Sequence, residues 1–117
     1  MKRFCLVFAL FILSLSVHAE LSLTFLKNYC FKCHGPEKQE AHRRFDQLLP
    51  AITKLEELES WQEILDQLNL GDMPPEKEKQ PAKTDVLAVI KSITESIAEA
   101  HPRLAGKGQH TALRRMN

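Results

Sequence analysis

The stretch Cys30-Phe31-Lys32-Cys33-His34 places two thiols three positions apart and a histidine directly after the second thiol. Cys-x-x-Cys-His is the attachment signal for c-type haem. At this spacing the thiols can add to the two vinyl groups on one edge of the porphyrin, and the histidine then lies under the iron. We therefore expect one covalent haem c on Cys30 and Cys33, with His34 as the proximal iron ligand.

The first 19 residues have the three-part pattern of a secretory signal peptide. Lys2 and Arg3 form a positive start, residues 4–13 are an unbroken apolar run, and Val17-His18-Ala19 resembles a cleavage site. Cleavage after Ala19 shortens the chain of 117 residues by 19, to 98. We expect the mature protein in the periplasm or another exported compartment, where c-type haem is assembled. A short buried helix and an uncleaved anchor are the alternative interpretations.

Three other interpretations of the cysteine pair are less consistent with the sequence. A thioredoxin-type redox pair usually opens a helix after a strand, and no strand pattern precedes Cys30. A disulfide across two intervening residues closes a tiny loop and stabilises little. A zinc site needs two further ligands, and the spacing of His42 and His101 matches no common zinc pattern.

The sixth position of a haem iron has a candidate ligand in Met73. It lies in the segment Leu70-Gly71-Asp72-Met73-Pro74-Pro75, 39 residues after His34. Gly71 permits a tight turn, and the two prolines stiffen the chain after the sulfur. A thioether favours reduced iron, so His/Met ligation raises the reduction potential. His42 is the main competitor, and ligation by two histidines would lower the potential. Three other candidates are expected to be exposed: His101, His110 and Met116.

Glycine and proline divide the mature chain into helix-sized pieces, and few segments alternate with the period of a strand. Ser60 with Glu63 fits a capping box at a helix start, and Pro102 is expected to stop the last helix. Two apolar stripes have helical spacing: Leu58, Trp61, Leu65 and Leu68, then Val86, Ile90, Ile93 and Ile97. The expected helices are Leu21 to Tyr29, a short turn at Arg43 to Leu49, Ser60 to Leu70, and Ala82 to Ala100.

Composition bounds the remaining possibilities. Of the residues, 44% are hydrophobic and 26% are charged, which suits one globular domain. The net charge is +1 and becomes −1 without Lys2 and Arg3, so binding to nucleic acid by charge is not expected. No apolar stretch reaches the roughly 20 residues of a membrane helix. Apolar side chains near the motif are expected to line a haem: Phe25, Leu26, Tyr29, Phe31, Leu48, Leu65 and Leu68.

A family resemblance rests on four parts of the sequence. Residues 25–39, Trp61, the segment Leu70-Gly71-Asp72-Met73-Pro74-Pro75-Glu76 and Gln80-Pro81 resemble the N-terminal cytochrome c domain of large exported planctomycete and verrucomicrobial proteins. The resemblance covers about residues 20–101. It implies a small all-α class I cytochrome c fold, a bundle of three to four helices around one covalent haem, with His34 proximal and Met73 distal. Residues 41–46 match the family only loosely, so no role is transferred to them.

The sequence predicts a signal peptide at 1–19, a cytochrome c domain at 20–104 and a tail or linker at 105–117. Ala112-Leu113-Arg114-Arg115-Met116-Asn117 resembles the start of the domain that follows the cytochrome in these proteins, which would make the chain a fragment or a truncated form. We expect an exported electron carrier with one haem and no enzymatic activity of its own. Its partner would be a redox protein or that downstream domain. The alternatives are a haem-based sensor or gas-binding module and a haem-free thiol or interaction domain.

Overall fold

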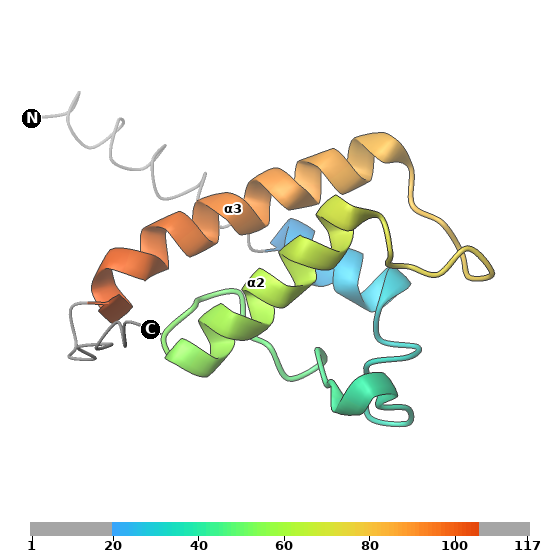
Figure 1. Cartoon of the computed structure of the whole chain (residues 1–117), viewed down its shortest axis with the longest axis horizontal. Helices are drawn as coiled ribbons and strands as arrows, with labels where there is room; N and C mark the ends of the chain where they lie inside the picture. Colours follow the sequence, from blue (N-terminus) through green and yellow to red (C-terminus); the bar gives the residue numbers. More distant parts are fainter. Residues whose placement is uncertain (1–19, 106–117) are drawn as a thin grey trace, which may run out of the picture.

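Two long helices, α2 (Leu55–Leu70) and α3 (Lys83–Ala105), pack against each other in the computed structural model, which describes residues 20–105. Figure 1 shows both helices with the helical segment 20–29 beside them. A short 3-10 turn, η1 (Glu40–His42), lies in the loop between segment 20–29 and α2. The described residues contain no strand, only an isolated bridge between His34 and Gln39. The all-α prediction is confirmed for this part of the chain.

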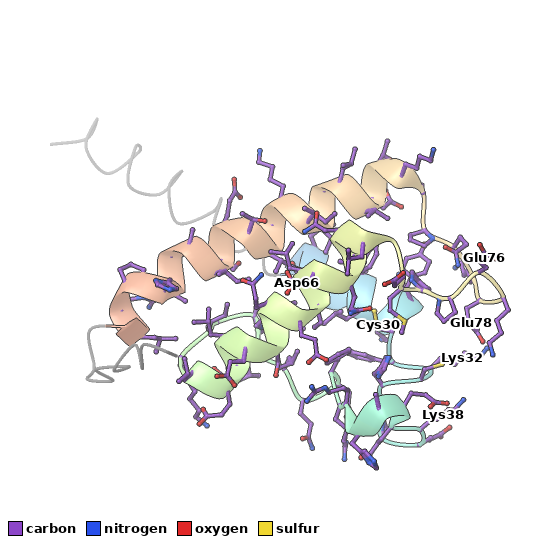
Figure 2. All side chains as sticks on the ribbon, viewed as in Figure 1. Cys30, Lys32, Lys38, Asp66, Glu76 and Glu78 are labelled. Carbon is purple, nitrogen blue, oxygen red and sulfur yellow. The ribbon has the colours of Figure 1, made fainter. Side chains whose placement is uncertain are left out.

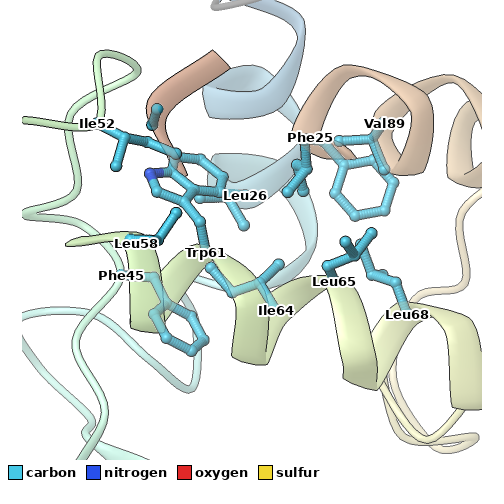
Figure 3. Packing of buried hydrophobic residues seen from close by; sticks show 12 residues of the cluster. Phe25, Leu26, Phe45, Ile52, Leu58, Trp61, Ile64, Leu65, Leu68 and Val89 are labelled. Carbon is cyan, nitrogen blue, oxygen red and sulfur yellow. The ribbon is translucent and has the colours of Figure 1, made fainter. Parts of the chain in front are cut away.

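The apolar stripe predicted for α2 faces the core. Leu58, Trp61, Leu65 and Leu68 are all buried, and Ile64 joins them on the same face. Segment 20–29 contributes Phe25 and Leu26 to the same cluster, as Figure 3 shows. The indole N–H of Trp61 donates to the carbonyl oxygen of Leu49 at 3.2 Å, so the loop before α2 is tied to the helix.

The predicted start of α2 at Ser60 is wrong, because the helix begins one turn and a half earlier at Leu55. The carboxylate of Glu57 accepts hydrogen bonds from the backbone N–H groups of Thr53 and Lys54, at 2.8 and 3.1 Å. It thereby satisfies donors that a helix start leaves free. The hydroxyl of Ser60 instead donates back to the carbonyl oxygen of Glu56 at 2.9 Å, inside the helix. The cap is therefore supplied by Glu57, from an acidic run that is typical of a solvated helix face.

The predicted end of the last helix is also wrong, because α3 continues through Pro102 to Ala105. The fixed φ of proline is compatible with a helix, and near the end of the helix the ring removes only one backbone hydrogen bond. The predicted stripe is only partly right. Ile93 is buried, whereas Val86, Ile90 and Ile97 are half-buried against the core. The other buried residues of α3 have small or short side chains: Val89, Ser92 and Ala100.

The helical turn predicted at Arg43 to Leu49 is absent from the structure. The turn that forms is η1, and residues 43–49 are irregular. Phe45 explains the difference, because its side chain is buried and its backbone N–H donates to the carbonyl oxygen of His34 at 2.8 Å. The backbone N–H of Phe45 therefore bonds to the cysteine motif rather than to its own preceding turn.

The predicted signal peptide and residues 106–117 of the predicted tail lie outside the described residues. Ala105, which was assigned to the tail, is the last residue of α3. Between residues 20 and 105, no helix combines the length and the apolar character that crossing a membrane requires.

Leu26→Ala should lower the free energy of unfolding by about 2–5 kcal/mol, because the Leu26 side chain is fully buried and its removal leaves a cavity. Chemical denaturation followed by circular dichroism measures the change. Leu87→Ala is the matched control, since Leu87 is 67% exposed and should lose less than about 0.5 kcal/mol. Equal losses in the two variants would contradict the assignment of the core.

Candidate haem-attachment site

Cys30, Cys33 and His34 lie on one turn that continues from segment 20–29. The N–H of Cys30 donates to the carbonyl oxygen of Leu26 at 2.8 Å, so the helical hydrogen bonding of segment 20–29 extends to the first cysteine. The N–H groups of Cys33 and His34 then both donate to the carbonyl oxygen of Cys30, at 3.1 and 2.9 Å. The three predicted side chains are therefore brought together, and both thiols are free and half-buried.

The surroundings of Cys30 do not favour a reactive thiolate. Burial, and to a lesser extent the neighbouring Cys33, raises the pKa of Cys30 to about 12. At neutral pH this thiol is protonated, whereas redox-active cysteines in thiol oxidoreductases have lowered pKa values. The described residues also contain no group of three or more His, Cys, Asp or Glu side chains arranged to hold a metal ion. His42 and His101 are thus not gathered with the two cysteines.

The imidazole of His34 has one nitrogen engaged by the protein. Nδ1 lies 3.1 Å from the carbonyl oxygen of Glu40. A carbonyl oxygen only accepts, so the proton of the neutral ring is on Nδ1, and the lone pair on Nε2 is free to bind a metal. The ring also contacts Phe45, with centroids 4.9 Å apart. A histidine that ligates a metal usually donates its other N–H in this way.

A tight loop after His34 brings the Glu40 carbonyl into position. The N–H of Gly35 donates to the carbonyl oxygen of Lys38 at 2.8 Å, and the N–H of Glu40 donates to that of Cys33 at 2.9 Å. Gly35 is buried so close to the preceding turn that a Cβ there would lie 2.3 Å from the carbonyl oxygen of Phe31. Only glycine fits this position without a shift of the backbone.

Met73 lies in the loop that follows α2, and its side chain is 39% exposed. Gly71 ends the helix in the left-handed conformation, with φ of 75°, and its N–H returns to the carbonyl oxygens of Gln67 and Leu68. This is the arrangement in which glycine commonly closes a helix. The Met73–Pro74 peptide bond is cis.

An ion pair joins the Met73 loop to the cysteine turn. Nζ of Lys32 lies 2.6 Å from Oε2 of Glu78, although the two residues are 46 positions apart. The hydrogen bond and the charge of Lys32 lower the pKa of the Glu78 carboxyl, and Glu78 raises the pKa of Lys32. Figure 2 shows Cys30, Lys32 and Glu78 at the same end of the molecule.

The donor set of these segments fits a c-type haem. Two free thiols three positions apart are available for covalent attachment, the His34 imidazole presents Nε2, and Met73 offers a soft sulfur ligand. The apolar residues predicted to line a haem take part in the core. Phe25, Leu26, Leu65 and Leu68 are buried, and Tyr29, Phe31 and Leu48 are half-buried against them.

The competing histidines lie elsewhere. His42 is exposed at the end of η1, with a positive φ of 58°. His101 is exposed on α3 and lines a separate cavity of about 580 Å³ between α2 and α3. His110 and Met116 lie outside the described residues. The sequence did not reveal the roles of Glu40, Phe45 or the Lys32–Glu78 pair, because a backbone carbonyl and contacts distant in sequence leave no local pattern.

The comparison with known families agrees with this geometry. Residues 30–77 match the family described as Planctomycete cytochrome C. This match supports a planctomycete cytochrome c domain in this part of the chain. The matched range begins at Cys30 and ends within the Met73 loop at Lys77, so it includes all four predicted site residues: Cys30, Cys33, His34 and Met73. No curated protein and no solved structure matches the chain.

Gly35→Ala should destabilise the cytochrome domain by about 1–3 kcal/mol, because its new methyl group would overlap the Phe31 carbonyl oxygen. Thermal unfolding measures the effect, and the yield of haem-loaded protein should fall with it.

Gly71→Asn is the matched control. Gly71 needs a left-handed backbone but has no atom within 4 Å of an added Cβ, and asparagine tolerates that conformation. Its cost should therefore be smaller. A Gly35→Ala variant as stable as the native protein would show that the close approach is not needed.

Proposed function

We propose that this chain is an exported c-type cytochrome that holds one haem on Cys30 and Cys33 and transfers single electrons. The observation that carries the proposal is the state of His34, whose Nδ1 is bonded to the Glu40 carbonyl oxygen on the same turn as two free thiols. A disulfide would not require this oriented imidazole, and a zinc site would need further ligands that the described residues do not gather. The family match over residues 30–77 supports the same conclusion.

Some residues of the site would bind the haem, and others orient the His34 ligand. Cys30 and Cys33 would hold the haem through thioether bonds, and Nε2 of His34 would be the proximal ligand. When bound, haem supplies an iron that cycles between the ferric and ferrous states. The hydrogen bond to Glu40 fixes the orientation of the His34 ring and increases its basicity. The ring of Phe45 packs beside the imidazole, which limits rotation of the ring.

Met73 is proposed as the distal ligand. Its loop starts at the end of α2 and is tied to the cysteine turn through Lys32 and Glu78. A thioether ligand from Met73 would stabilise ferrous iron, so the carrier would have a raised potential. His42, the competing candidate, is exposed in η1, the turn whose Glu40 bonds to Cys33 and His34.

Electron transfer places few demands on the chain beyond the haem, and we propose a carrier rather than an enzyme. Its partner would be a separate redox protein or a downstream domain of the same protein. Export to the periplasm or a similar compartment follows from the signal-peptide pattern of residues 1–19. In this proposal the protonated Cys30 thiol makes a haem-free thiol function the weakest alternative.

A haem-based sensor or gas-binding module is the second candidate function. The observation that favours it is the exposed Lys32–Glu78 pair that ties the Met73 loop to the cysteine turn, because a weakly held distal ligand can be displaced by a small molecule. Carbon monoxide binding by the native ferrous protein distinguishes the two functions. Ready binding without any substitution supports the sensor, and exclusion supports the carrier.

The protein purified from a host with the c-haem maturation system should contain one haem per chain and show a single reversible one-electron step. Spectroscopic redox titration, combined with iron analysis of the same sample, measures both quantities. A protein in which both cysteines are replaced by serine is the control and should carry no haem after denaturation. Two redox steps, or more than one haem per chain, would rule out a monohaem carrier.

Met73→His should lower the reduction potential strongly while the iron stays low-spin, since axial ligation is a main reason that haem potentials span about 0.8 V. Met73→Ala should allow the ferrous protein to bind carbon monoxide. His42→Ala is the control and should leave both properties unchanged. If His42→Ala opens the sixth position and Met73→Ala does not, the assignment of the distal ligand is wrong.

A further inference from the structure

The side chain of Gln80 holds the segment after Met73 together. The amide nitrogen of Gln80 lies 3.2 Å from the carbonyl oxygen of Pro74, 2.8 Å from that of Pro75 and 3.1 Å from that of Glu78. These bonds close residues 74–80 into one unit, and the N–H of Glu78 reinforces it by donating to the Pro75 carbonyl oxygen at 2.9 Å. Met73 directly precedes this unit, so a movement of the unit would move the backbone of Met73.

Two cationic contacts tie this unit to the cysteine turn. Lys32, which lies between the two cysteines, pairs with Glu78 at 2.6 Å. The second cation belongs to the unit itself: Nζ of Lys79 lies 5.3 Å from the centroid of the Tyr29 ring. Tyr29 is the residue directly before Cys30. A cation at this distance from an aromatic face is attracted to it. Figure 2 shows the labelled Lys32 and Glu78 close to each other beyond the end of α2.

We infer that Lys32 and Glu78 are positioning residues that form a latch, which keeps the Met73 loop closed against the cysteine turn and Met73 available to the iron. This inference rests on the proposed function, because it requires Met73 as the distal ligand. When the ion pair separates, the unit of residues 74–80 can move away, and Met73 moves with it. The sixth position then opens to an external ligand.

The expected size of the effect follows from the exposure of the pair. The Lys32 side chain is 76% exposed and that of Glu78 is 24% exposed, so water and salt weaken their attraction. Pairs of this kind shift an equilibrium by about two- to fivefold. A ligand that binds only the open form has an apparent affinity proportional to the population of that form. Loss of the latch should therefore appear directly in ligand affinity.

The experiment measures imidazole binding to the ferric, haem-loaded full chain at low ionic strength. Lys32→Gln and Glu78→Gln should each raise the apparent affinity about two- to fivefold. The charge swap that combines Lys32→Glu with Glu78→Lys should return the affinity to near the native value. Salt at about 1 M should bring the native protein to the level of the single variants, because it screens the pair.

Lys91→Gln is the matched control for charge. Lys91 pairs with Glu95 at 4.0 Å on α3, so its loss removes the same charge outside both the attachment loop and the Met73 loop. Its imidazole affinity should stay at the native value. Unchanged affinity in both Lys32→Gln and Glu78→Gln, or no rescue by the charge swap, would overturn the latch.

Met73→Ala separates failure of the latch from failure of the proposed ligation. It should raise imidazole affinity by itself, and adding Glu78→Gln should then have no further effect. If Met73→Ala raises the affinity and the latch variants do not, the latch is wrong and the ligation stands. If Met73→Ala leaves the affinity unchanged, Met73 is not the ligand, and both the ligation and the latch are overturned.

Discussion

The candidate site depends most on one hydrogen bond, from Nδ1 of His34 to the carbonyl oxygen of Glu40 at 3.1 Å. It sets the tautomer of the imidazole and leaves Nε2 free as a ligand. The loop that brings this carbonyl to the ring closes only because Gly35 can approach the Phe31 carbonyl. The N–H of Glu40 donates to the Cys33 carbonyl oxygen, so the same residue is held by hydrogen bonds on both sides. The His34 ring, the loop that follows it and the two thiols are therefore held together as one unit.

The core connects this turn to the second ligand segment. Segment 20–29 buries Phe25 and Leu26 against α2 and α3, and the cysteine turn continues directly from it. The buried face of α2 runs to Leu68, and Gly71 then turns the chain into the Met73 loop. Each ligand segment is thus anchored at one end in the same apolar cluster. The exposed Lys32–Glu78 pair makes the remaining connection, which is weaker and sensitive to salt.

The sequence allowed the helical class, the buried stripe of α2 and the cysteine turn to be predicted, because each depends on spacing within a few residues. The helix ends were harder to predict. Glu57 caps α2 from a run of glutamates that looks like plain surface, and Pro102 is accommodated inside α3. Phe45 was assigned to a helical turn, yet its burial against His34 determines the course of the loop. Glu40 acts on His34 through its backbone carbonyl, and the Lys32–Glu78 pair forms only when segments 46 positions apart meet, so no local sequence pattern predicts either contact.

Tryptic peptide mapping of the purified, haem-loaded protein tests covalent attachment at Cys30 and Cys33 most directly. Trypsin cuts after Lys27, Lys32 and Lys38, so it separates Cys30 in peptide 28–32 from Cys33 in peptide 33–38. The proposed thioether bonds predict one species that contains both peptides and one haem and that survives reduction. Two unmodified peptides, or a pair that separates on reduction, would contradict haem attachment and return the cysteines to a thiol or disulfide role.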